Sequence, residues 1–225
     1  WYHPADPQLF ADEEILPLFA HLRETDPVHL TEDSPYGPYW SVTRFDDIKR
    51  VDMDAESFSS EAYHGGIMID DDIVGKPGSD FFVRSFITMD APDHGLHRKA
   101  VNQIVAPKSL RNFESLIRSR AQATLDSLPV GETFDWVDKV SIELTTQMLA
   151  TLFDFPFDER RRLTRWSDVT TAEADSPLVE SQEARIAELM ECLAWFKELK
   201  AQRRGGNDLD LVTMLANDAV TQDQP

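Results

Sequence analysis

The chain has 225 residues, 41% of them hydrophobic and 10% aromatic, enough to bury a core as one large or two small domains. Its net charge of -19 excludes general affinity for nucleic acids or anionic membranes. The sequence has no run of the roughly 20 apolar residues that span a bilayer and no signal-peptide pattern, so we expect a cytoplasmic location. The single cysteine, Cys192, excludes an internal disulfide and any Cys-x-x-Cys site for zinc or iron-sulfur clusters.

The first part of the chain, residues 13–58, predicts helices on either side of a small hairpin. Apolar residues recur every three or four positions between Glu13 and Leu22, as they do on one face of a helix. Short strands are predicted at 28–30 and 39–43, because a Ser-Pro-Tyr-Gly-Pro turn separates them. Asp46 is expected to cap the short helix that follows.

A long irregular loop is predicted at 59–88. It contains Gly65-Gly66 and Gly75-Lys76-Pro77-Gly78, which interrupt any regular pattern. Loops of this length in compact domains are either functional or disordered, and the many apolar residues here favour an ordered lining. The three aspartates at 70–72 lack the spacing of a calcium loop, so a solvated acidic bend is the better interpretation.

Residues 89–216 predict a series of helices with short joints. The expected helices run from Asp90 to Pro107, over 110–128, over 140–152, from a cap at Asp158, from Ser176-Pro177 to Gly205-Gly206, and from a cap at Asp210. The sequence contains no repeat of fixed period, which argues against a solenoid. The predicted fold class is mainly α with a small β-hairpin edge.

The ten residues Met-Asp-Ala-Pro-Asp-His-Gly-Leu-His-Arg, 89–98, contain the best candidate site. Asp90 is expected to cap a helix whose first turn includes Pro92. His94 and Arg98 are four residues apart and therefore share a helix face, where an imidazole and a guanidinium form a paired donor surface for carboxylates or phosphates. The alternative is an ordinary surface helix, in which Arg98 pairs with Asp90 or Asp93.

The order of helix, hairpin, helix, long loop and then Phe-Ile-Thr-Met-Asp-Ala-Pro-Asp-His, with Arg four residues on, resembles the N-terminal half of bacterial cytochrome P450 enzymes. The resemblance covers nearly the whole chain, including Trp-Ser-Val-Thr-Arg-Phe-Asp-Asp-Ile at 40–48 and Ala-Pro-Lys-Ser-Leu at 106–110. It implies that His94 and Arg98 bind the propionates of haem. The stretches 135–150 and 163–168 are similar to the class that hydroxylates the terminal carbon of alkanes and fatty acids.

The same resemblance implies which parts of the family's fold the 225 residues lack. In the family the cysteine that binds the haem iron lies in a Phe-x-x-Gly-x-x-x-Cys-x-Gly loop, whereas Cys192 lies on a predicted helix, where a small buried hydrophobic role is expected. The central acid-alcohol helix and the Glu-x-x-Arg helix are also absent from the sequence. We therefore expect one partial domain over 1–225, truncated before the central helix and the cysteine loop, without catalytic residues of its own and inactive alone.

The position along the chain suggests which residues contact substrate and a redox partner in such an enzyme. The loop before residues 89–98 and the turn after the fourth predicted helix correspond to substrate-lining regions of the family, although the same side chains also suit core packing. The substrate-lining candidates are Ile67, Ile69, Phe86, Ile87 and Val169. The candidates for docking a ferredoxin-type donor, with plain solvation as the alternative, are Lys99, Lys108 and Arg111.

A basic cluster, Arg160, Arg161, Arg162 and Arg165, is expected to pair with Glu159 or Asp158 on the helix surface. The sequence as a whole predicts part of a haem-dependent monooxygenase that hydroxylates an aliphatic small molecule with dioxygen and electrons from a redox partner, and no metal site apart from the haem iron. Two rivals remain: an acidic helical protein-interaction module without a cofactor, and a degenerate haem-binding or sensor protein.

Overall fold

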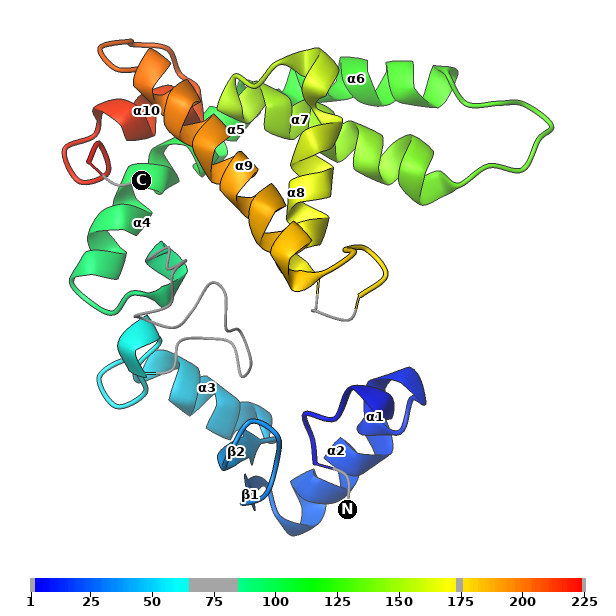
Figure 1. Cartoon of the computed structure of the whole chain (residues 1–225), viewed down its shortest axis with the longest axis vertical. Helices are drawn as coiled ribbons and strands as arrows, with labels where there is room; N and C mark the ends of the chain where they lie inside the picture. The colour runs from blue at the N-terminus through cyan, green and yellow to red at the C-terminus, as the bar shows by residue number, and fades with distance from the viewer. Residues whose placement is uncertain (1–2, 65–84, 173–175, 224–225) are drawn as a thin grey trace. The chain divides into compact units, whose positions relative to one another are not determined.

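The structure is a computed structural model that describes residues 3–64, 85–172 and 176–223. The chain forms two compact units, Trp1–His94 and Gly95–Pro225, which Figure 1 shows in blue to cyan and in green to red. Each unit is described by itself below. The prediction of one partial domain over 1–225 stays a prediction.

The first unit contains short helices and one hairpin. Its elements are α1 (Pro7–Ala11), α2 (Ile15–Thr25), β1 (Val28–Thr31), β2 (Tyr39–Val42), α3 (Phe45–Met53), η1 (Ala62–His64) and η2 (Phe86–Thr88). The strands pair antiparallel with Val28 opposite Val42, so the predicted hairpin is confirmed. The hydroxyl of Tyr39 accepts a hydrogen bond from the amide of Ala5 at 3.0 Å, which holds the N-terminal segment against the hairpin.

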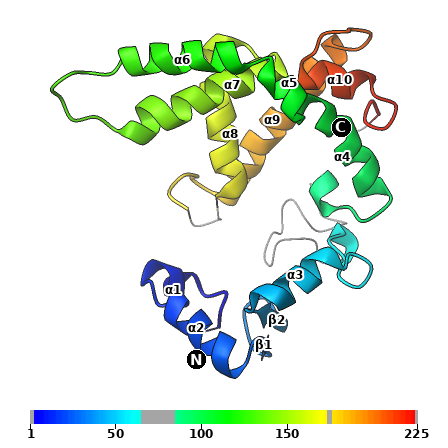
Figure 2. The ribbon, with the colours of Figure 1, turned by 180° about the vertical axis from the view of Figure 1, so that it is seen from behind.

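The second unit is a series of helices, as predicted. Its elements are α4 (Asp93–Val105, which starts in the first unit), α5 (Pro107–Arg111), α6 (Glu114–Asp126), the π-helical turn η3 (Val137–Ile142), α7 (Glu143–Phe153), η4 (Phe157–Glu159), α8 (Arg161–Thr171), α9 (Gln182–Gln202) and α10 (Leu211–Asn217). Figures 1 and 2 show α6 and α7 lying antiparallel, with α8 against both α7 and α9. The helix predicted over 110–128 is broken between α5 and α6.

Outside residues 89–98, two predicted helix caps and one predicted helix start are wrong, and one predicted cap is confirmed. Asp46 and Asp158 lie inside helical turns, and Ser176 precedes the start of α9 by several residues. The N-cap residues in the structure are Arg44 for α3, Arg160 for α8 and Ser181 for α9. Asp210 does cap α10, because its carboxylate accepts from the amide of Thr213 at 2.8 Å. Several polar residues precede each helix, and the sequence pattern does not say which one reaches the free amides.

An aromatic cluster between α7, α8 and α9 forms the core of the second unit. Phe155 is buried after the end of α7, and its ring meets that of Trp166 edge to face with centroids 6.0 Å apart. Trp195 and Phe196 of α9 lie 5.4 and 6.3 Å from the same ring. Aromatic pairs in this geometry contribute about 0.5–1.5 kcal/mol each beyond burial. The cluster therefore fixes α8 between its two neighbours.

Ion pairs between helices surround this core. Glu143, at the start of α7, accepts hydrogen bonds from Arg160 at 2.7 Å and from Arg161 at 3.0 Å. Arg165 donates to both carboxylate oxygens of Glu188 on α9, at 2.8 and 2.5 Å. These partners lie 17 to 23 residues away along the chain, so the pairing with Glu159 or Asp158 expected for these three arginines is wrong.

Arg162 is the member of the basic cluster that behaves as predicted. It pairs with Glu159 at 2.5 Å, and its second nitrogen reaches Glu191 of α9. Its guanidinium also lies over the rings of Trp166 and Trp195, 4.8 and 4.2 Å from their centroids. Both carboxylates raise the pKa of Arg162 above its ordinary value, so this side chain stays a cation between the two helices.

We predict that Glu143→Gln destabilises the second unit by about 1.5–3 kcal/mol at pH 7, the usual contribution of a charge-assisted hydrogen bond. Burial raises the pKa of Glu143, but hydrogen bonds from Gln147, Arg160 and Arg161 outweigh burial and hold that pKa below its ordinary value. A lowered carboxyl pKa stabilises the fold above the unfolded-state value and loses that contribution as the pH falls through the folded-state value.

Urea unfolding at pH 7 and at pH 3 measures the effect. The difference in stability between the two chains should narrow as the pH falls from 7 to 3, because protonation of the Glu143 carboxylate removes the charge on which the stabilisation depends. The exposed Glu132→Gln is the matched control and should match the unsubstituted chain at both pH values. An equal loss of stability for Glu143→Gln at both pH values would contradict the electrostatic origin.

Candidate functional site

The segment that precedes α4 is held by a buried methionine and a tight turn. Met89 is 2% exposed and anchors the chain in the first unit. Just before it, the hydroxyl of Thr88 donates to the carbonyl of Ser85 at 2.9 Å and closes η2. Local packing therefore fixes the entry to the candidate haem-binding helix.

Asp90 does not cap α4, and that prediction is wrong. Its carboxylate accepts hydrogen bonds from the hydroxyl of Ser59 at 2.5 Å and from the amide of Ser60 at 3.0 Å. These hydrogen bonds lower the pKa of Asp90 below its ordinary value. The side chain thus joins two segments that stand 30 residues apart in the sequence. The backbone carbonyl of Asp90 accepts a hydrogen bond from the amide of His94 at 2.9 Å. Asp90 therefore connects the two ends of the loop predicted at 59–88 and also forms the first hydrogen bond of the helix.

This role of Asp90 has no signal in the sequence, because the aspartate, proline and acidic residue at 90–93 match the pattern of a helix start. Only the folded chain brings Ser59 and Ser60 to the carboxylate. The two serines are the residues that the sequence reasoning missed.

His94 and Arg98 lie one turn apart on α4, and both side chains are exposed. The ring of Phe86 meets the imidazole of His94 edge-on, with centroids 6.2 Å apart and planes at 68°. Among the described residues no carboxylate lies within ion-pair distance of Arg98, so its predicted alternative pairing with Asp90 or Asp93 is not observed. The two side chains provide several N–H donors with no competing anion at Arg98, and this donor set fits the carboxylates of haem propionates.

The substrate-lining candidates have different environments. Ile67 and Ile69 lie outside the described residues. Phe86 is half-buried and Ile87 is 49% exposed on η2, so Ile87 offers apolar surface to a ligand. Val169 has no exposed surface on α8, which suits core packing. The assignment of a substrate role to these side chains stays a prediction.

Two of the three docking candidates present accessible positive charge. Lys99 on α4 and Arg111 on α5 are exposed, whereas the side chain of Lys108 is outside the description. Neither Lys99 nor Arg111 takes part in an ion pair with another described residue. Their docking role stays a prediction.

Cys192 packs against the aromatic cluster on α9. Burial raises the pKa of its thiol to about 11, and the nearby Glu191 adds to this effect. A thiol with this pKa is almost wholly protonated near neutral pH and is a poor metal ligand. Its predicted role as a small hydrophobic side chain fits this environment.

The described residues contain no helix that is long and apolar enough to cross a membrane. They also contain no group of three His, Cys, Asp or Glu side chains arranged to hold a metal ion. The aspartates at 70–72 lie outside the described residues.

No family model matches the chain. Comparison with known proteins finds relatives that are named monooxygenases. The linalool 8-monooxygenase of Pseudomonas putida is 31% identical over 215 residues, which cover 94% of this chain and 53% of that protein. A steroid C26-monooxygenase of Mycolicibacterium smegmatis is 30% identical, over 90% of this chain and 48% of that protein. The solved structure of cytochrome P450-153 from Novosphingobium aromaticivorans is 37% identical, with a TM-score of 0.83, over 99% of this chain and 55% of that one.

The chain therefore spans about half the length of the relatives that it matches. The predicted fold class is confirmed, because the mainly helical chain with one small hairpin superposes on about half of such a structure. The rival interpretation as an acidic interaction module is not favoured.

We predict that Asp90→Ala speeds hydrogen exchange of the Ser60 amide, because the substitution removes its acceptor. Exchange measured residue by residue near pH 6, where Asp90 is ionised, tests this. Asp54→Ala is the matched control, since Asp54 accepts from Ser57 only three residues away and its loss should leave Ser60 unchanged. Unchanged exchange at Ser60 in Asp90→Ala would remove the proposed tie between the two segments.

We also predict that Cys192 of the native chain reacts with iodoacetamide at pH 8 about 100-fold more slowly than the same thiol in the urea-unfolded chain. A pKa of about 11 leaves roughly 0.1% thiolate at pH 8, against a far larger fraction at an ordinary cysteine pKa. Because the chain has one cysteine, the unfolded chain is its own control. Equal rates would show that the thiol is accessible and unperturbed.

Proposed function

We propose that this chain, a homologue of cytochrome P450s along nearly its whole length, is the N-terminal part of a haem-dependent monooxygenase. The observation that carries the proposal is the exposed pair His94 and Arg98 on α4, where no carboxylate of the described residues forms an ion pair with Arg98. When bound through a cysteine thiolate, haem supplies the dioxygen chemistry. The only cysteine of the 225 residues, Cys192, packs against the aromatic cluster and has a raised thiol pKa, so we propose that the chain alone is inactive.

The pair would hold the propionate edge of the haem by charge-assisted hydrogen bonds. Arg98 is permanently charged and presents a planar fork that matches a carboxylate. His94 would add a second donor one turn away, with its ring oriented by the edge contact to Phe86. The buried Met89 fixes the position of this turn from one side, and the carbonyl of Asp90 begins the helix.

We propose an aliphatic substrate hydroxylated at its terminal carbon. The names of two relatives each specify one position of oxidation, position 8 of linalool and carbon 26 of a steroid. The exposed Ile87 and the half-buried Phe86 offer an apolar wall next to His94. Ile67, Ile69 and Val169 complete the proposed set of substrate-lining residues.

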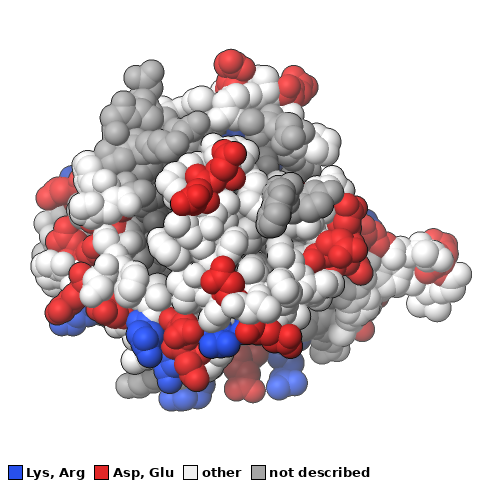
Figure 3. Space-filling view, turned by 90° about the horizontal axis from the view of Figure 1, so that it is seen from below, with Lys and Arg blue, Asp and Glu red and all other residues white. Residues whose placement is uncertain are grey.

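We propose a ferredoxin-type electron donor that docks at Lys99, Lys108 and Arg111, in a cytoplasmic enzyme. On the face that Figure 3 shows, acidic side chains are widely spread and the visible basic ones lie beside them. In a chain of net charge -19, cations without acidic partners are the places where an acidic partner meets attraction instead of repulsion. Lys99 and Arg111 satisfy that condition.

The function is tested by joining residues 1–225 to the remaining part of the Novosphingobium aromaticivorans cytochrome P450-153, which is 37% identical over the matched half. We expect a thiolate-type Soret shift of the reduced carbon-monoxide complex and conversion of octane to 1-octanol with a ferredoxin system. The absence of the shift would overturn the monooxygenase proposal. Oxidation of internal carbons only would overturn the proposal of a terminal carbon.

In the same chimera, Arg98→Ala should weaken haem retention by roughly 10- to 100-fold, because it removes a charge-assisted hydrogen bond of about 1.5–3 kcal/mol. Haem content after gel filtration at rising dilution measures this. Arg98→Lys should retain part of the affinity, since it keeps the charge and loses the fork. Arg50→Ala, an exposed arginine on α3, is the control and should retain haem. Equal retention by all variants would remove Arg98 from the site.

A further inference from the structure

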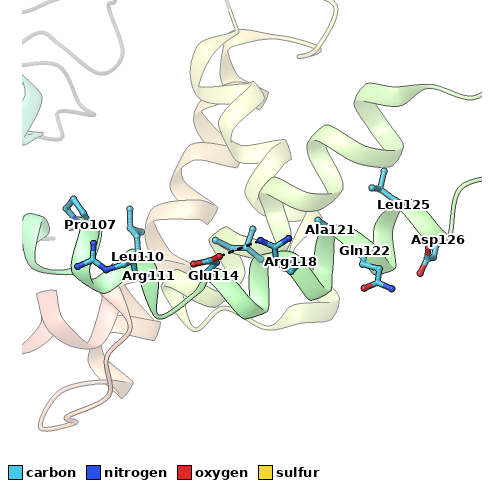
Figure 4. Close-up of a pocket in the computed structure, with 10 residues that line it drawn as sticks. Pro107, Leu110, Arg111, Glu114, Arg118, Ala121, Gln122, Leu125 and Asp126 are labelled. Atoms are coloured by element: carbon cyan, nitrogen blue, oxygen red, sulfur yellow. Dashed lines mark hydrogen bonds and ion pairs between the residues drawn. The ribbon is translucent and has the colours of Figure 1, made fainter.

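The imidazole of His94 is oriented by an aromatic contact in the described part of the chain. The ring of Phe86 meets it edge-on, with centroids 6.2 Å apart and planes at 68°. The imidazole forms no hydrogen bond or ion pair with another described residue. An exposed cation of the other unit, Arg118, is oriented differently: as Figure 4 shows beside the groove along α5 and α6, it pairs with Glu114 at 3.5 Å. Where Arg118 has a carboxylate, His94 has an aromatic ring.

The backbone fixes both partners of this contact, which belong to the same unit. Phe86 begins η2, a single turn closed by a hydrogen bond from the hydroxyl of Thr88 at 2.9 Å. Met89 is 2% exposed, and the amide of His94 donates to the carbonyl of Asp90 at 2.9 Å. Burial and hydrogen bonds therefore hold the segment between the two rings at several points, so that Phe86 stays beside the imidazole.

An exposed imidazole without such a neighbour samples several orientations. The outer torsion of histidine is broad and roughly two-fold, so the rotamer preference of His94 does not fix the ring. Only an orientation that turns a ring N–H toward a propionate provides a hydrogen bond. Holding the side chain in that orientation before binding lowers the entropic cost of binding. An aromatic pair in edge geometry favours one orientation by about two- to tenfold.

We propose that Phe86 is a positioning residue for haem binding, which acts through His94 by holding the imidazole in the orientation that donates to a propionate. This role is separate from the apolar surface that Phe86 offers to a substrate, and it links the proposed substrate-lining residues to the haem site through one side chain. The inference rests on the proposed function, because it requires that His94 binds haem.

The test is a double-substitution cycle in the chimera of residues 1–225 with the remaining part of the Novosphingobium aromaticivorans cytochrome P450-153. The rate of haem transfer to excess apomyoglobin, without substrate, is measured for the parent chimera, Phe86→Leu, His94→Ala and the double variant. We expect Phe86→Leu to speed haem loss about two- to tenfold, and His94→Ala to speed it at least as much. The double variant should lose haem no faster than His94→Ala, because the ring then has no imidazole to hold.

Two further variants separate the role of the ring from a general effect on stability. Phe86→Tyr keeps the ring and should lose haem at the parental rate. Phe10→Leu makes the same substitution at a 57% exposed phenylalanine of α1 and should also match the parent. Circular dichroism of each haem-free chimera measures its helix content. Should Phe86→Leu lower that content, Phe86→Met takes its place in the cycle.

An equal increase in haem loss from Phe86→Leu with and without His94 overturns the proposal, since the ring would then act on the fold and not through the imidazole. A parental rate for Phe86→Leu, where His94→Ala loses haem faster, also overturns it and leaves His94 in the haem site. A parental rate for His94→Ala overturns both roles at once. The measured rates thus distinguish a failure of this inference from a failure of the proposed haem site.

Discussion

The guanidinium of Arg162 lies over the rings of Trp166 and Trp195, and its nitrogens pair with Glu159 and Glu191. This single side chain joins η4, α8 and α9, and the aromatic cluster around Phe155 packs beneath it. An arginine stacked on aromatic rings keeps its edge free for carboxylates, which a lysine does not. The position of α8, with Val169 at its buried face, follows from this arrangement. The packing of α8 against α9 therefore depends on ion pairs as well as on apolar contacts.

The candidate haem site depends on a different kind of constraint. His94 and Arg98 share a helix face because α4 is continuous across the turn that separates them. The place where α4 begins is set by Met89 and Asp90. Because the carboxylate of Asp90 also holds Ser59 and Ser60, the start of the helix and the two ends of the preceding loop are fixed together. A change in that loop is thus expected to affect, through Asp90, the position of His94 and Arg98, the proposed propionate-binding residues.

The sequence by itself determined the helical class, the hairpin and the pairing of His94 with Arg98 on one face, because all three depend on local spacing that periodicity and turn residues reveal. It also indicated the family, since the motif around His94 is contiguous. Only the tertiary structure decided which residues cap the helices, which carboxylates Arg160 and Arg165 meet, and that Asp90 holds Ser59 and Ser60 instead of capping α4. These contacts join residues far apart in the chain, and one-dimensional spacing carries no signal for partners that only folding brings together.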